Sequence, residues 1–273
     1  MEAVFPVSIQ PLIDAYLHAL EPLRYHFYGI YISGSIALGA FEELASDIDI
    51  VALTQNEWSS LELKQLKALH RHLIKSYPLG KRFEVHYVPL RYLGVVHPGT
   101  QNGAIAPYPA AHNGKFSPAT HAGLNAVTWW IIKHKGLCLL GPERSALPLG
   151  VAWKDVLSRM RFNLDVYFPR KTKRPYLFLF DAAVEFAVTN LCRILTTIEE
   201  GEIISKSASL TRWRDRLPER WQLLLDEAWR IRHHLSQPSL YHHRFQRMSE
   251  TLAFIRYGRI RGCKALDASS FVK

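Results

Sequence analysis

Hydrophobic and polar residues follow two different periods along the first ninety residues of the chain. Apolar residues at helical spacing predict helices over residues 9–23 and 57–77. Runs rich in aromatic and β-branched residues, or alternating between apolar and polar side chains, predict strands over residues 27–33, 47–53 and 82–90. The order helix, strand, strand, helix, strand indicates an α/β domain in which a small mixed sheet has flanking helices.

The pattern becomes irregular after this segment. Residues 94–118 are rich in Gly, Pro, Asn and Ala without a steady period, which predicts a long surface loop. A helix over residues 120–135 and a short buried strand over residues 137–140 follow. We therefore expect the α/β domain to occupy residues 1–150.

Strand patterns vanish beyond about residue 150. Helical patterns then follow one another, separated by prolines and one glycine, over residues 153–167, 177–200, 205–216, 219–235 and 241–257. These patterns predict an all-α helical bundle over residues 151–262. Residues 263–273, after Gly262, are expected to form a frayed tail.

Composition excludes several classes of protein. The chain has 273 residues, of which 48% are hydrophobic and 21% charged, so it can bury a core and is not disordered as a whole. No apolar run approaches the length of a membrane span, and the first residues include Glu2 and do not resemble a signal peptide. Three widely spaced cysteines, Cys138, Cys192 and Cys263, fit a reducing compartment. We expect a cytoplasmic monomer without a membrane partner.

Charge is distributed unevenly between the two halves. Residues 1–100 hold 8 Lys and Arg against 10 Asp and Glu, a net charge of −2. Residues 101–273 hold the remaining 26 basic against 14 acidic residues, a net charge of +12. The basic half favours phosphates or polyanions as partners.

Candidate chemistry is concentrated at the ends of the predicted strands. Gly34 and Ser35 follow the first strand, Asp47 and Asp49 open the second, and Glu84 lies near the start of the third. Because residues i and i+2 of a strand point to the same face, the two aspartates lie side by side. Clustered carboxylates repel one another unless a cation neutralises them, and hard oxygen ligands select Mg²⁺, which takes the rest of its shell from water and substrate phosphates. The pattern therefore predicts a site for Mg²⁺ and a nucleoside triphosphate.

Residues 34–49, GSIALGAFEELASDID, carry the Gly-Ser and Asp-x-Asp motifs in an order that resembles the nucleotidyltransferase superfamily of the DNA polymerase β type. Within it, this segment is similar to the streptomycin/spectinomycin aminoglycoside adenylyltransferases. A C-terminal likeness to the helical domain of those enzymes is carried by residues 190–195 (NLCRIL), 201–206 (GEIISK), Trp213 and Leu217-Pro218. The resemblance spans roughly residues 25–235.

The resemblance implies an antibiotic-resistance transferase that moves AMP from ATP to a hydroxyl, with a helical domain that closes over ATP and the acceptor. It implies the following roles: phosphate contacts for Ser35 and Ser46 beside Gly34, metal binding for Asp47 and Asp49, proton abstraction and a place near the metal for Glu84, and phosphate binding for Arg193 and Lys206. In-line transfer needs such cations, because charge builds on the phosphate oxygens.

The stretch that precedes the Arg193 helix departs from the family. Related enzymes place acidic residues there for a polycationic antibiotic, whereas this chain has only Asp181 and Glu185, four residues apart and hence on one helical face. Four basic residues stand ahead of them: Arg170, Lys171, Lys173 and Arg174. They predict repulsion of a cationic acceptor, while Asp181 and Glu185 are the candidates for a reduced acidic site that binds the acceptor.

Alternatives to a small-molecule acceptor remain open. The basic half also fits a nucleotidyltransferase that binds or modifies RNA, with Arg212, Arg214, Arg216 and Arg220 beside Trp213 and Trp221 as a candidate face. A non-catalytic regulatory nucleotide-binding protein is a further alternative. The histidine pairs 233–234 and 242–243 lack a complete set of transition-metal ligands.

Overall fold

The computed structural model describes residues 6–96, 106–120 and 124–270, and the chain divides into two compact units, Met1–Asp155 and Val156–Lys273. We call them the sheet unit and the helical unit. The α/β fold and the helical C-terminal half predicted from the sequence are both confirmed. No helix in the described ranges is long and apolar enough to cross a membrane.

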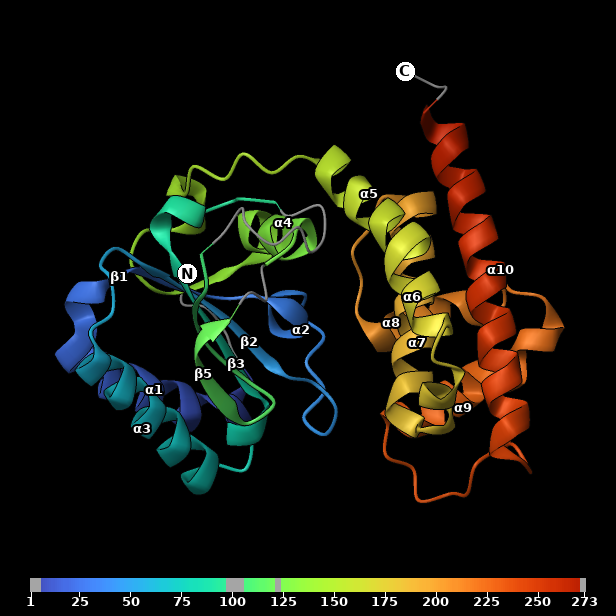
Figure 1. The fold of residues 1–273 in the computed structure, drawn as a ribbon, viewed down its shortest axis with the longest axis horizontal. Coiled ribbons are helices and arrows are strands. Elements are labelled where there is room, and N and C mark those ends of the chain that lie inside the picture. Colours follow the sequence, from blue (N-terminus) through green and yellow to red (C-terminus); the bar gives the residue numbers. More distant parts are fainter. Residues whose placement is uncertain (1–5, 97–105, 121–123, 271–273) are drawn as a thin grey trace. The chain divides into compact units, whose positions relative to one another are not determined.

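The sheet unit is built on one mixed sheet (Figure 1). Its strands are β1 (Phe27–Ile32), β2 (Ile48–Thr54), β3 (Phe83–Pro89), β4 (Tyr108–His112), β5 (Lys115–Thr120) and β6 (Leu137–Leu140), in the order β5-β4-β3-β2-β1-β6. β2 and β3 pair in parallel, while the other neighbouring pairs are antiparallel. The parallel pair is possible because a helix returns the chain from the end of β2 to the start of β3.

That helix is α3, and its start is set by the sequence. α3 spans Ser60–Ser76, and a capping box at its N-terminus pairs Ser59 with Glu62. Its buried leucines join α1 (Gln10–Leu20) and the sheet in one hydrophobic core. The unit also holds α2 (Gly34–Ala37), α4 (Ala126–Lys135) and the 3₁₀ turns Val7–Ile9, Glu21–His26, Gly80–Arg82, Leu90–Tyr92 and Arg144–Ala146.

The structure corrects the expected long loop over residues 94–118. Residues 97–105 lie outside the described part of the chain, but β4 and β5 form a hairpin where the loop was expected. Asn113 and Gly114 join the two strands, and both have positive φ angles, 50° and 67°. An Asn-Gly pair favours this tight two-residue turn. Small and polar residues in β4 and β5 hid the strand pattern.

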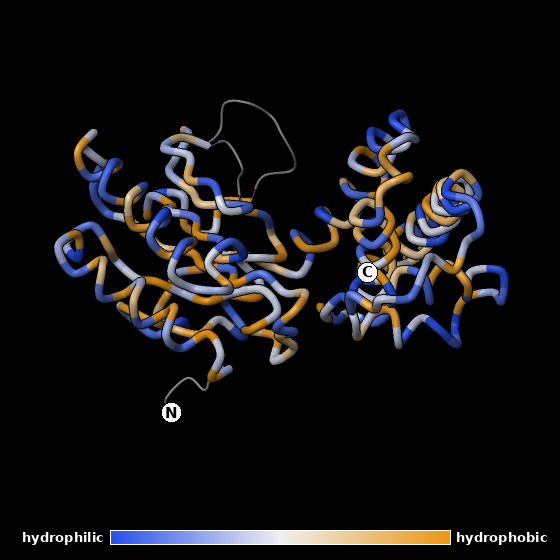
Figure 2. Tube along the Cα trace, turned by 90° about the horizontal axis from the view of Figure 1, so that it is seen from below, coloured by the Kyte–Doolittle hydropathy of each residue, from blue (hydrophilic) through white to orange (hydrophobic). Residues whose placement is uncertain are grey.

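The helical unit is organised around α7 (Asp181–Glu200), which contacts α8 (Lys206–Arg214), α9 (Gln222–Arg232) and α10 (Arg244–Ser270). α5 (Trp153–Phe162), which begins at the unit boundary, leads through a π-helical turn (Asn163–Tyr167) into α6 (Phe168–Thr172), and 3₁₀ turns cover Pro175–Leu179 and Glu219–Trp221. Gly201 ends α7 with a φ of 72°, a conformation that glycine adopts without strain. Orange hydrophobic and blue hydrophilic positions alternate along the chain in Figure 2, as expected for helices with one buried face.

The C-terminal end differs from the expected frayed tail. α10 continues to Ser270, and Leu266 on it is buried. Gly262 does not end the helix. A Cβ atom on Gly262 would lie 2.7 Å from Leu164 Cδ1, so the missing side chain lets α10 approach Leu164 closely.

Candidate active site

Two of the predicted carboxylates lie opposite each other in the sheet. Asp49 is the second residue of β2 and Glu84 the second residue of β3, and the parallel register pairs them directly. Asp47 precedes β2 and is exposed, Asp49 is partly buried, and Glu84 is 8% exposed. The sheet therefore brings together residues that are 35 positions apart in the sequence.

Two opposing sets of effects act on the pKa of Glu84. Burial, followed by the negative charge of Asp47, raises the pKa of Glu84, and this effect outweighs contacts that lower it. Those contacts come from the β4–β5 hairpin: His112 Nδ1 lies 2.6 Å from Glu84 Oε2, and the Asn113 N–H donates to Oε1 at 3.3 Å. His112 was not predicted as a site residue from the sequence. The Asn113-Gly114 turn was the signal that could have placed it beside β3.

Gly34 allows the chain to pass close to Asp49. It has a φ of 59° at the start of α2, and a Cβ atom there would lie 1.8 Å from Asp49 Oδ2. The Ser33 N–H donates to the Asp49 backbone oxygen at 2.8 Å. The chain after β1 is thus held against Asp49, and only glycine fits at position 34.

The two predicted phosphate-contacting serines differ in their surroundings. Ser46 is buried, and its Oγ accepts a hydrogen bond from the Glu42 N–H at 3.0 Å, while Arg82 Nη1 donates to its backbone oxygen at 3.1 Å. Ser35 Oγ is buried and makes no hydrogen bond to any described protein atom. A polar atom of this kind is ready to bond to a ligand.

The chemistry of this corner suits Mg²⁺ shared with a nucleotide. Asp47 raises the pKa of Glu84, which shows that these negative charges repel each other. A divalent cation relieves that repulsion, and phosphate oxygens and waters complete its shell. Among the described residues, no group of three or more His, Cys, Asp or Glu side chains is gathered as a ready-made metal site.

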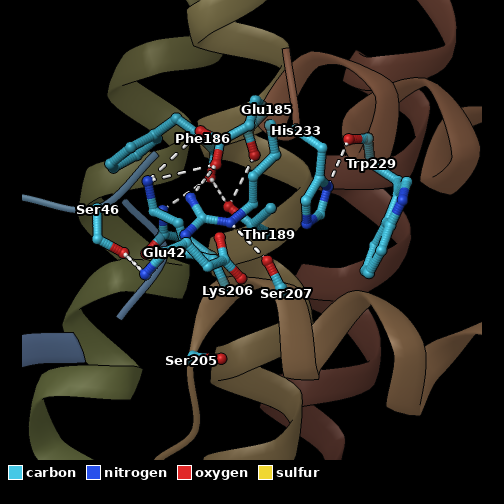
Figure 3. A network of polar contacts seen from close by, with 12 residues as sticks. Glu42, Ser46, Glu185, Phe186, Thr189, Ser205, Lys206, Ser207, Trp229 and His233 are labelled. Carbon is cyan, nitrogen blue, oxygen red and sulfur yellow. Dashed lines mark hydrogen bonds and ion pairs between the residues drawn. The ribbon is translucent and has the colours of Figure 1, made fainter. Parts of the chain in front are cut away.

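Arg193 and Lys206 lie on neighbouring helices of the helical unit. Arg193 Nε on α7 donates to the Ile204 backbone oxygen at 2.9 Å, which ties α7 to the loop before α8. Lys206 is the first residue of α8, after the N-cap Ser205, and its side chain is 30% exposed. The ammonium lies 3.4 Å from both carboxylate oxygens of Glu185 (Figure 3).

The two acidic residues expected to bind the acceptor both form ion pairs with arginines. Asp181 lies 2.8 Å from Arg247 and 3.6 Å from Arg230, and Glu185 lies 3.1 Å from Arg232. All four basic residues of the segment ahead of them are exposed: Arg170, Lys171, Lys173 and Arg174. Electrostatically, this surface favours a weakly charged or anionic ligand over a polycation.

The candidate nucleic-acid face lacks its stacking platforms. Trp213 is 0% and Trp221 2% exposed, so both rings belong to the core. Arg212, Arg214 and Arg216 pair with acidic side chains of the same unit. The structure therefore does not support the alternative in which these two tryptophans stack on nucleic-acid bases.

Comparisons with known proteins agree with this architecture. Residues 181–255 match the model of the aminoglycoside adenylyltransferase C-terminal domain. A spectinomycin adenyltransferase, AAD(9) from Enterococcus faecialis, crystallised with ATP and spectinomycin, has a similar fold, with a TM-score of 0.66 and 15% sequence identity over 92% of this chain and 98% of that chain. A search of curated proteins gave no significant match.

The mixed sheet followed by a helical C-terminal half is consistent with the nucleotidyltransferase fold expected from the sequence. Within that class, the family model matched by residues 181–255 is that of adenylyltransferases, and the similar solved structure shares the fold. The match of residues 181–255 to the aminoglycoside adenylyltransferase C-terminal domain agrees with the resemblance found in the sequence.

Proposed function

We propose that this protein transfers AMP from ATP to a hydroxyl group of an aminocyclitol antibiotic of the spectinomycin type, with Mg²⁺, as a cytoplasmic monomer. The observation that carries the proposal is the direct pairing of Asp49 with Glu84 beside the Gly34 turn. The family match of the C-terminal domain and the ATP and spectinomycin bound to the structural relative support the same reaction.

Each candidate site residue of the sheet unit has a proposed role in this reaction. Asp47 and Asp49 would hold Mg²⁺, which when bound neutralises charge on the triphosphate. The Ser35 hydroxyl, which has no hydrogen-bond partner among the described protein atoms, donates to a phosphate oxygen, and Ser46, eleven residues later in the motif, is the second proposed phosphate contact. Glu84 accepts the proton of the acceptor hydroxyl, whose oxygen forms a bond to the α-phosphorus as the bond to pyrophosphate breaks.

The helical unit contributes fixed positive charge. Arg193 and Lys206 match the phosphate-binding positions of the family, and both side chains are held by contacts within their own unit. Fixed cations stabilise the charge that develops on the phosphates without needing to reorganise during the reaction.

The charged residues at the start of α7 and ahead of it indicate which class of acceptor the protein uses. Asp181 and Glu185 already neutralise arginines, so a polycationic aminoglycoside would gain little from them. An aminocyclitol with fewer charges does not depend on a strongly acidic site. The four exposed cations at residues 170–174 favour RNA as the second candidate acceptor.

Pyrophosphate release by the purified protein tests the proposal. The protein is incubated with MgATP and, separately, spectinomycin, streptomycin or tRNA, and the products are examined by mass spectrometry. We expect pyrophosphate and an adenylylated antibiotic with spectinomycin. Adenylylation of tRNA alone would support the RNA alternative, and ATP binding without transfer to any acceptor would support the non-catalytic one.

A further inference from the structure

Glu185 lies between two cations in the interior of the helical unit. The residue is 9% exposed, and its Oε1 atom is 3.1 Å from Arg232 Nη1 and 3.4 Å from Lys206 Nζ. Oε2 is also 3.4 Å from Lys206 Nζ. Figure 3 shows the Glu185 carboxylate and the Lys206 side chain in one network of dashed contacts.

Arg232 fixes the far side of this network. Its side chain is only 5% exposed, and its Nε donates to Ser207 Oγ at 2.7 Å. Ser207 directly follows Lys206 in α8. Arg232 on α9 therefore bonds both to the helix that carries Lys206 and to the carboxylate that faces Lys206.

Glu185 is poorly suited to binding a cationic acceptor. Withdrawing its carboxylate from Arg232 would break the ion pair of a buried guanidinium, which is unfavourable. By contrast, the Lys206 side chain is partly exposed. Its Nζ atom contacts the Glu185 carboxylate and lies 6.0 Å from the centroid of the Phe186 ring. An ammonium has three donors, so it can bond to a phosphate while Glu185 restrains it.

We propose that Glu185, held in place by Arg232, is a positioning residue that fixes the Lys206 ammonium for the phosphates of the nucleotide. This role rests on the proposed function, and it replaces the acceptor contact expected for Glu185. The three side chains carry two positive charges and one negative charge, which leaves one net positive charge for a phosphate. The site thus gains a cation whose direction is set before ATP arrives.

A double-mutant cycle on MgATP affinity tests this role. The dissociation constant of MgATP is measured by titration calorimetry for the full chain and for Lys206→Ala, Glu185→Gln and the double variant. We expect Glu185→Gln to weaken MgATP binding about five- to tenfold, and Lys206→Ala to have little further effect in that background, because the two side chains act as one unit. The matched control is Glu199→Gln, on the same helix and paired with Arg261, which should leave MgATP affinity unchanged.

Arg232 provides a second route if Glu185→Gln unfolds. Arg232→Gln should also weaken MgATP binding, and Arg232→Lys, which keeps a cation beside Glu185, should restore most of it. A purely structural role would not produce this rescue without a parallel change in melting temperature, which circular dichroism measures for each variant.

Several outcomes would overturn the proposal. Additive effects of the two single substitutions, or tighter MgATP binding by Glu185→Gln, would show that Glu185 does not position Lys206. A raised KM for the antibiotic with unchanged MgATP affinity would return Glu185 to the acceptor site. Wild-type protein that binds MgATP but transfers no AMP would contradict the proposed reaction alone, whereas wild-type protein without MgATP affinity would overturn both.

Discussion

The Nδ1 atom of His112 lies 2.6 Å from Oε2 of Glu84, in a contact between adjacent strands of the sheet. With the Asn113 N–H on Oε1, the β4–β5 hairpin holds both oxygens of the carboxylate. A carboxylate fixed in this way is suited to accept a proton along one direction. The contact links a turn dipeptide, Asn113-Gly114, to the orientation of the residue that we assign as the base.

Replacement of Glu84 by Gln should separate catalysis from nucleotide binding. We expect the turnover number to fall by about 10²- to 10⁴-fold, the usual contribution of a general base, and MgATP affinity to stay within a few-fold. Steady-state kinetics and titration calorimetry measure the two effects. A large loss of MgATP affinity would instead make Glu84 chiefly a metal ligand, and an unchanged turnover number would place the base elsewhere.

Gly34→Ala should inactivate the enzyme through Asp49. The new Cβ atom would lie 1.8 Å from Asp49 Oδ2, so the carboxylate or the turn must move. We expect turnover to fall by at least about 100-fold, because the proposed metal and phosphate contacts depend on this corner. Gly39→Ala is the matched control: Gly39 also has a positive φ, 68°, but nothing lies within 4 Å of its Cβ position. Equal losses of activity in both variants would point to backbone strain instead.

Asp49→Ala should abolish turnover and leave the fold intact. The substitution removes a proposed metal ligand that is only partly buried, and it also relieves repulsion among the carboxylates. We therefore expect the melting temperature of the ligand-free protein to stay equal or rise, while added Mg²⁺ no longer improves ATP binding. The exposed Glu57, replaced by Gln, serves as a control that should retain full activity. Substantial activity of Asp49→Ala would contradict the metal assignment.

The sequence predicted the sheet residues of the site because a strand, a glycine turn and spaced acids have local patterns. The parallel register that pairs Asp49 with Glu84 followed from the helix between their strands. His112 and Arg232 could not be predicted in the same way, since their contacts to Glu84 and Glu185 depend on how a hairpin and a distant helix pack. The helix end predicted at Gly262 was wrong, because a glycine can either end a helix or allow another residue to pack closely against the middle of one.

A buried charge network should make the helical unit sensitive to acid. Glu227 is 0% exposed; burial raises its pKa, but hydrogen bonds from Arg230, the Leu240 N–H, Ser239 and Arg247 outweigh burial and lower the pKa from 4.5 to about 2. A carboxyl whose pKa is lowered by folding stabilises the folded state at pH values above its pKa in the unfolded chain. The stabilisation should therefore be complete above pH 4.5 and disappear as the pH falls toward 2.

Glu227→Gln tests the contribution of this network. At pH 7 we expect a loss of about 3 kcal/mol, because Arg230 and Arg247 lose their buried carboxylate partner and keep only the half-exposed Asp181. The difference from the wild type should shrink between pH 4.5 and pH 2, as measured by calorimetry. Glu219→Gln, at an exposed position, is the control and should change stability little at any pH. A constant difference across this range would show that packing, not charge, is responsible.

The charges around the start of α7 predict which antibiotic the protein prefers as acceptor. Arg170, Lys171, Lys173 and Arg174 are exposed, and the nearby acids Asp181 and Glu185 are paired with arginines. Each unscreened like-charge contact costs about 1 kcal/mol at partial exposure. We therefore expect a much higher KM for streptomycin than for spectinomycin, which carries less charge, in steady-state assays at low ionic strength.

Substitution of Lys171, Lys173 and Arg174 by Ser should identify the surface that causes this preference. If the segment faces the acceptor, the KM for streptomycin falls because cation repulsion is removed, and the KM for spectinomycin changes less. If RNA is the acceptor, the same variant binds it more weakly and with a shallower dependence on salt, since fewer counterions are released. Tight streptomycin binding by the wild type that is insensitive to the triple substitution would show that these cations only face solvent, and the predicted preference for spectinomycin would then be wrong.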